Sequence, residues 1–131
     1  MNERSPSEII QDFLDLIEES HTEYEDAKSK ISFYDSRTYD WTHDLEDAAN
    51  KSERGKLATA WQKELRQRRI EKDRFKMWEK VHEWGCDPMN KSCLKRLKQL
   101  LSKQKDTENY INTPYQDREY KRRVVKKDEV N

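Results

Sequence analysis

Apolar and small side chains recur at alternating steps of three and four residues through the first quarter of the chain. The positions with this spacing are Ile10, Phe13, Ile17, Ser20, Tyr24, Ala27, Ile31 and Tyr34. The spacing places its members on one side of an α-helix, where they form a heptad-like seam. Ser5, Pro6 and Glu8 supply an N-cap, a first helical residue and a capping-box acid. The pattern therefore predicts a helix over residues 6–34.

A second, shorter helix is expected over residues 37–49. Asp35 and Ser36 are suitable capping residues for it. Trp41, Leu45 and Ala48 continue the spacing of the first seam, so one unbroken helix over residues 6–49 is the alternative.

The third predicted helix covers residues 53–84, capped by Ser52 after a turn that begins at Asn50. Its apolar positions are Leu57, Trp61, Leu65, Phe75, Trp78 and Val81. The apolar stripe thins between Leu65 and Phe75, where Arg68 and Lys72 occupy the expected positions. Gly85 is the expected stop of this helix.

Residues 86–90 are expected to form a loop, followed by a fourth helix over residues 91–103 that buries three leucines. These are Leu94, Leu97 and Leu101. Residues 105–131 are polar and lack periodicity, which predicts a mobile tail after a helical domain of residues 1–104.

The expected fold class is all-α, an antiparallel helical hairpin or small helical bundle with coiled-coil-like packing. Apolar residues make up only 32% of the chain and charged residues 41%, which suits long helices with a narrow apolar stripe better than a round core. A homodimer that doubles this core is a further expectation. No apolar run is long enough to cross a membrane, and no secretory signal opens the chain, so the expected location is the cytoplasm.

The two signs of charge are separated along the chain. Residues 1–50 carry 14 acids and 4 bases, whereas residues 51–131 carry 13 acids and 23 bases. Either the paired helices neutralise each other, or one charged face binds a partner of opposite sign. Candidate partner-binding residues are Arg66, Arg68, Arg69, Lys72 and Lys76. The basic helix segment 63–76 could alternatively bind nucleic acid, and the acidic first helix could occupy a positive groove.

Two sets of residues resemble metal ligands, and neither is predicted to form a metal site. The acid pairs Asp15/Glu18 and Asp44/Asp47 are similar to the paired acidic motifs of Mg²⁺-dependent all-α nucleotide pyrophosphohydrolases, but that family usually has Glu where Asp15 and Asp44 stand. His82, Cys86 and Cys93 suggest zinc, yet a fourth ligand would have to come from His43 or Asp87. Ordinary packing or surface positions are the expected role of the cysteines, and no cofactor or catalytic residue is predicted.

The segments Asp40–Glu46 and Arg66–Asp73 belong to a stretch, residues 31–80, that carries dense charge of both signs, scattered Trp and Tyr, and one glycine. In this composition and charge pattern, residues 31–80 resemble small helical proteins of phages and prophages of Gram-positive bacteria. The resemblance implies a non-enzymatic protein that inhibits or modulates a host or defence complex in a bacterial cytoplasm, for example a CRISPR nuclease. A nucleic-acid-binding regulator and a nucleotide hydrolase remain the alternatives.

Overall fold

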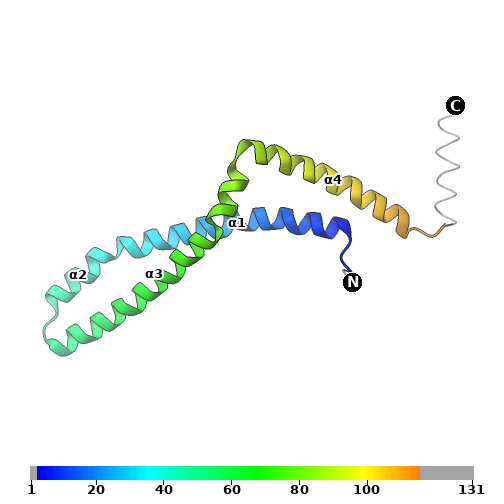
Figure 1. Cartoon of the computed structure of the whole chain (residues 1–131). Helices are drawn as coiled ribbons and strands as arrows, with labels where there is room; N and C mark the ends of the chain where they lie inside the picture. Colours follow the sequence, from blue (N-terminus) through cyan, green and yellow to red (C-terminus); the bar gives the residue numbers. More distant parts are fainter. Residues whose placement is uncertain (1–2, 116–131) are drawn as a thin grey trace. The chain divides into compact units, whose positions relative to one another are not determined.

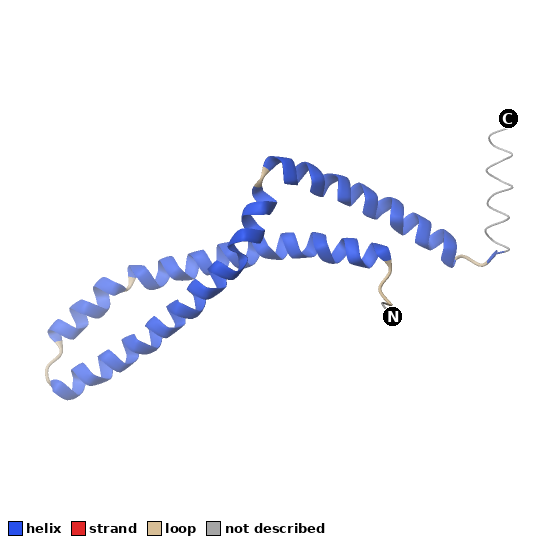
Figure 2. Cartoon of the chain, viewed as in Figure 1, coloured by secondary structure: helices blue, strands red, loops and turns tan. Residues whose placement is uncertain are grey.

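The computed structural model describes residues 3–115, which form four α-helices and no strand (Figures 1 and 2). The helices are α1 (Pro6–Ser36), α2 (Thr38–Asp47), α3 (Lys51–Cys86) and α4 (Pro88–Asn112). The prediction of an all-α fold with antiparallel packing is confirmed. None of the described helices is long and apolar enough to cross a membrane.

The chain divides into two compact units. Of the described residues, the terminal unit contains 3–15 and 91–115, and the hairpin unit contains Leu16–Asn90. Within the hairpin unit, the later part of α1 and then α2 run antiparallel to α3 (Figure 1).

The terminal unit joins the start of α1 to the end of α4. Ser5 Oγ accepts a bond from the Glu8 amide at 3.4 Å, as expected of a cap. The backbone amide and hydroxyl of Ser7 donate to the Glu108 carboxylate at 3.0 and 2.6 Å. Among the described residues of this unit, Leu14 and Leu101 are the buried apolar ones.

The Ser7–Glu108 contact makes the terminal unit sensitive to acid. Bonds from Ser7 hold the pKa of Glu108 below its ordinary value. A carboxylate with a lowered folded-state pKa contributes stability above its unfolded-state pKa, and this contribution disappears as the pH falls through the folded-state value. Glu108→Gln is therefore expected to lower stability at neutral pH and to match wild type in strong acid. Thermal unfolding between pH 7 and pH 2 tests this, and a difference that persists at pH 2 would contradict it.

The helix boundaries differ from the predictions at several points. Asp35 and Ser36 do not cap α2, since Ser36 Oγ donates back to Phe33 O and Arg37 takes the cap position without a side-chain bond. Asn50, rather than Ser52, caps α3 by accepting from the Glu53 amide at 2.9 Å.

The predicted stop at Gly85 and the loop over residues 86–90 are both wrong. Gly85 is buried inside α3, which continues to Cys86. Asp87 alone separates the two helices, and its carboxylate accepts from the Met89 amide at 2.9 Å at the start of α4. The lack of positive φ at Gly85 shows that the glycine is needed for space and not for a left-handed cap.

Helix α4 is longer than the predicted 91–103, because it begins at Pro88 and continues to Asn112. Part of the expected tail over residues 105–131 is thus helical. Its last turns are anchored by the bonds between Glu108 and Ser7, a long-range contact that helical periodicity does not reveal. The rest of that expectation, from residue 116 onward, lies outside the described residues.

The first seam buries its residues largely as predicted. In the hairpin unit, Ile17, Ser20 and Ala27 are buried and Tyr24 is half-buried. Ser20 satisfies its hydroxyl by donating to Ile17 O, which explains how a polar residue occupies a seam position. Phe13 is an exception, since it is exposed and its neighbour Leu14 is buried instead.

The middle of α3 packs through charged residues instead of apolar ones. Leu65 was expected in the core, but it is 47% exposed. The packed positions carry Glu64, Arg68, Glu71 and Arg74. Arg37 Nε lies 2.7 Å from Glu64 Oε1, and Arg68 Nε lies 2.6 Å from Asp35 Oδ1.

Arg74 is the centre of this charged layer. Its guanidinium lies 2.6 Å from Glu23 Oε2, 2.7 Å from Asp26 Oδ2 and 2.8 Å from Glu71 Oε2. Its bonds raise its own pKa, chiefly through Asp26, and the bond from Arg74 in turn lowers the pKa of Asp26. Charge neutralisation across the hairpin, one of the two interpretations of the charge separation, is therefore realised at Arg68 and Arg74.

Candidate functional site

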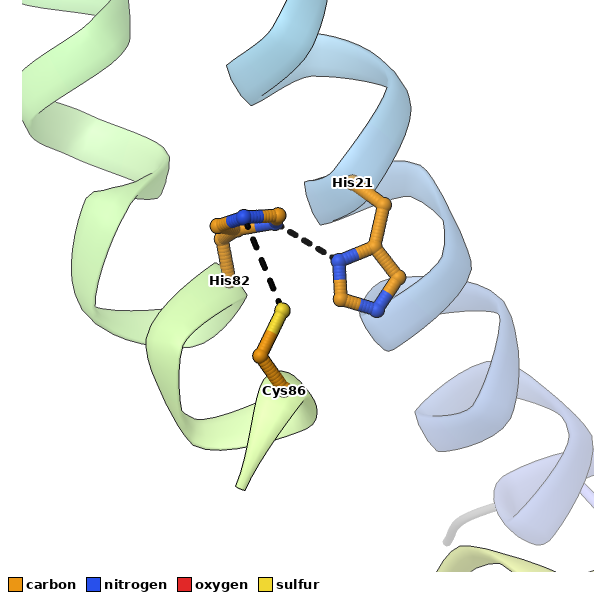
Figure 3. Close-up of side chains that lie close together, drawn as sticks. All are labelled: His21, His82 and Cys86. Carbon is orange, nitrogen blue, oxygen red and sulfur yellow. Dashed lines mark hydrogen bonds between the residues drawn. The ribbon is translucent and has the colours of Figure 1, made fainter. Parts of the chain in front are cut away.

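Three potential metal ligands converge in the hairpin unit, where α1 meets the end of α3. His21 comes from α1, and His82 and Cys86 come from α3; their side chains point toward one another (Figure 3). One ligand atom from each residue lies within 4.8 Å of the others. His21 Nδ1 is 2.7 Å from His82 Nδ1, and Cys86 Sγ is 3.6 Å from His82 Nε2. We call these three residues the His–Cys cluster.

Neighbouring side chains hold His82 in place. The Tyr24 ring stacks on His82 with centroids 4.0 Å apart and on Phe75 at 4.5 Å. His21 meets the His82 ring edge-on at 4.7 Å. The two ring nitrogens of His82 consequently face different partners, with Nδ1 toward His21 and Nε2 toward Cys86.

Gly85 allows the helices to approach at this point. A Cβ on Gly85 would lie 2.8 Å from Ile17 Cγ2 and 3.1 Å from His21 Cε1. Such distances are shorter than the optimal separation of packed carbon atoms, about 3.5–4.0 Å. A residue with any side chain would push α1 away, so the glycine and the cluster depend on the same close packing.

An acidic residue lies beside the cluster. Glu25 Oε1 is 4.0 Å from His82 Nε2, and its side chain is 63% exposed while that of His82 is 15% exposed. Glu25 follows His21 by four residues, just as Cys86 follows His82 by four residues. Each helix therefore presents two potential ligands one turn apart.

The other residues considered for zinc have different roles. Cys93 is an exposed free cysteine on α4 and is not a member of the cluster. His43 stacks on Tyr39 and lies 3.4 Å from the Asp47 carboxylate, and Asp87 caps α4. Of the candidate zinc ligands, His82 and Cys86 are brought together.

No protein-family model, curated protein or solved structure matches this chain.

A second feature of the hairpin unit is a groove of about 510 Å³ between α1 and α3. Its basic lining residues are Lys28, Arg69, Lys72 and Lys76. Ile31 and Phe75 supply apolar lining surface. We call this feature the basic groove.

The structure separates the five predicted partner-binding residues into three groups. Arg69, Lys72 and Lys76 line the basic groove and form no ion pair within residues 3–115. Arg66 is exposed outside the groove. Arg68 binds Asp35 and is therefore engaged within the hairpin.

The acid pairs that suggested Mg²⁺ are not gathered into a site. Within the described residues, the only group of three or more possible metal ligands is the His–Cys cluster. The carboxylates of Asp15, Glu18 and Asp44 are absent from it, and Asp47 lies beside His43.

Three residues of the His–Cys cluster and the basic groove, or beside them, are not among the candidate site residues identified from the sequence. His21 follows Ser20 in the first seam, and a histidine beside a seam position was the signal that it faces the partner helix. Glu25 and Lys28 lie among many charged residues, and only the pairing of α1 with α3 shows that they flank the cluster and the groove.

Proposed function

We propose that this protein is a non-enzymatic binding protein whose basic groove receives an acidic segment of a partner protein. The observation that carries the proposal is that Lys28, Arg69, Lys72 and Lys76 surround one groove and form no ion pair within the described residues. Arg68 and Arg74, on the same helix, have carboxylate partners. The groove is thus where positive charge is available to an external anion.

The lining of the groove favours a protein segment over a nucleic-acid backbone. Ile31 and Phe75 offer apolar contact, which phosphates do not use but apolar side chains of a peptide do. Asp73 and Glu79 also line the groove and repel any anion, so a phosphate backbone, charged at every nucleotide, fits less well than a peptide that can place uncharged residues beside them. Acidic residues alternating with apolar ones match this mixture of positive charge and apolar surface.

The kind of partner follows from the resemblance stated for residues 31–80. Most of the groove residues fall within that range. We propose a host or defence complex of a bacterium, such as a nucleic-acid-handling nuclease, as the owner of the acidic segment. Binding there would inhibit or modulate that complex.

Charge reversal in the groove tests the proposal. A photo-crosslinker at Ser32, which lines the groove, identifies the partner in cells, and the purified partner is then titrated by calorimetry. Lys72→Glu/Lys76→Glu should weaken binding by about tenfold or more, because the variant repels the acidic segment. Raising the salt concentration should weaken binding of the wild type.

Lys91→Glu/Lys95→Glu is the matched control, since it makes the same charge change at the same spacing on exposed lysines of α4. It should leave the affinity unchanged. Equal loss in both variants would reject the groove as the binding surface. Steeply salt-dependent binding of oligonucleotides that is abolished by Lys72→Glu/Lys76→Glu would instead support the nucleic-acid-binding alternative.

A further inference from the structure

We propose that the His–Cys cluster is a binding site for a single transition-metal ion of the zinc class, formed by His21, His82 and Cys86 with Glu25 as the fourth ligand. The site shares no residue with the basic groove. It would join α1 to α3 in the hairpin unit.

The ligand set and its spacing carry this proposal. Tetrahedral zinc sites use imidazole nitrogen, thiolate sulfur and carboxylate oxygen, with Zn–N near 2.0–2.1 Å and Zn–S near 2.3 Å. In a regular tetrahedron these bond lengths place a nitrogen and a sulfur ligand about 3.6 Å apart. The separation of His82 Nε2 from Cys86 Sγ is 3.6 Å.

The helices supply the ligands in matched pairs. His21 and Glu25 are four residues apart on α1, and His82 and Cys86 are four residues apart on α3. Residues at this spacing share one face of a helix, so the two faces can enclose one ion. His82 Nε2 is 4.0 Å from Glu25 Oε1, and the ligand atoms of the three clustered residues lie within 4.8 Å of one another. His82 Nε2 already faces Cys86 and Glu25, so binding of one ion requires His21 to move from His82 Nδ1 to the Nε2 side of the ring.

The surroundings restrict how the cluster can rearrange. Tyr24 stacks on His82, and Gly85 brings α3 against Ile17 and His21. The clustered ligands lie on helices, so an ion does not have to order a loop to bind them. Cys86 is exposed, which gives an ion a path from solvent.

The chemistry of the ligands selects the class of metal. Sulfur and imidazole ligands favour zinc, cobalt and copper ions over Mg²⁺ or Ca²⁺, which prefer oxygen. A bound ion would replace the contact between the two imidazoles with stronger bonds. Because the charged middle of α3 provides little apolar packing, such a link would add stability to this hairpin.

Cobalt(II) titration of the full-length protein under reducing conditions tests the site. One equivalent per chain should give the visible bands of a tetrahedral ion and a thiolate-to-cobalt charge-transfer band. Zn²⁺ should displace Co²⁺ and raise the midpoint of thermal unfolding, whereas Mg²⁺ should do neither.

Two pairs of variants make the assignment specific. Cys86→Ser should remove the charge-transfer band and the thermal shift, while Cys93→Ser, at the other exposed cysteine, should keep both. Glu25→Gln should weaken cobalt binding by about tenfold or more, and Glu19→Gln should not. These surface changes leave the fold intact, as circular dichroism would verify.

The proposal is overturned if the wild type shows no charge-transfer band, or if Cys93→Ser loses the band as Cys86→Ser does. Equal affinity of Glu25→Gln and wild type would remove Glu25 from the ligand set and leave a three-residue site. The acidic-partner measurements with Lys72→Glu/Lys76→Glu do not involve these residues, so failure of either proposal is seen separately.

Discussion

Replacing Gly85 with leucine is expected to lower the free energy of unfolding by about 3 kcal/mol, at the upper end of ordinary overpacking costs. Even its Cβ would lie 2.8 Å from Ile17 Cγ2, and Ile17 is only 5% exposed. The new side chain has no space unless α1 and α3 separate. Equilibrium urea unfolding, monitored by circular dichroism, measures the loss. The free energy of unfolding of Gly85→Ala should lie between those of the leucine variant and wild type.

Gly55 provides the matched control on the same helix. Nothing lies within 4 Å of a Cβ placed there, and neither glycine has a positive φ. Gly55→Ala should therefore stabilise α3 by about 0.5–1 kcal/mol, since alanine is the better helix former. If substitutions at Gly55 and Gly85 shifted stability in the same direction, close helix approach would not be the reason for Gly85.

Truncation of Arg74 is also expected to lower the free energy of unfolding substantially. Arg74→Ala should lower the free energy of unfolding by about 2 kcal/mol, because it leaves the half-buried Glu71 and Glu23 carboxylates without the guanidinium that they share. The Arg74 side chain is 24% exposed and that of Glu71 is 14% exposed, so water replaces the lost bonds incompletely. Arg74→Lys should recover part of the loss, since it keeps the charge without the planar fork.

Arg68→Ala is the comparison for Arg74. Arg68 binds the single carboxylate of Asp35, whose side chain is 52% exposed, and pairs of this kind contribute about 1 kcal/mol or less. Urea unfolding of both variants, at low and at high salt, measures the two contributions. Equal losses for Arg68→Ala and Arg74→Ala would contradict the idea that Arg74 organises the charged layer.

The helical seam was predictable because burial follows periodicity. Ile17, Ser20 and Ala27 recur at steps of three and seven, and each is buried. Periodicity failed where charge replaces apolar packing. Leu65 looked like a core residue, but its neighbour Glu64 takes the packed position because it binds Arg37 and the Trp41 indole.

Helix ends were harder to predict because several residues of similar propensity compete to cap them. Asn50 and Ser52 are both good caps, and only the bond to Glu53 decides between them. In the sequence, Gly85 resembles a C-terminal stop. In the structure, the absence of a side chain at Gly85 allows α1 to pack closely against α3.

The candidate sites were only half visible in the sequence. Arg69, Lys72 and Lys76 formed a recognisable basic run, whereas the partner residue Lys28 lies on another helix. His82 and Cys86 were noted as possible ligands, but His21 is 61 residues from His82. Contacts across such separations depend on the register of the helical pair, which one sequence does not specify.

Burial changes along the hairpin. Helix α2 has no buried residue, whereas Ile17 and Gly85 are packed at the opposite end of the same unit. Helix ends with few apolar contacts fray at little free-energy cost, while well-packed segments open only with global unfolding. Within the hairpin unit, amide hydrogen exchange should accordingly be fastest around the connection from Asp47 to Lys51, and slowest where Ile17 packs against Gly85.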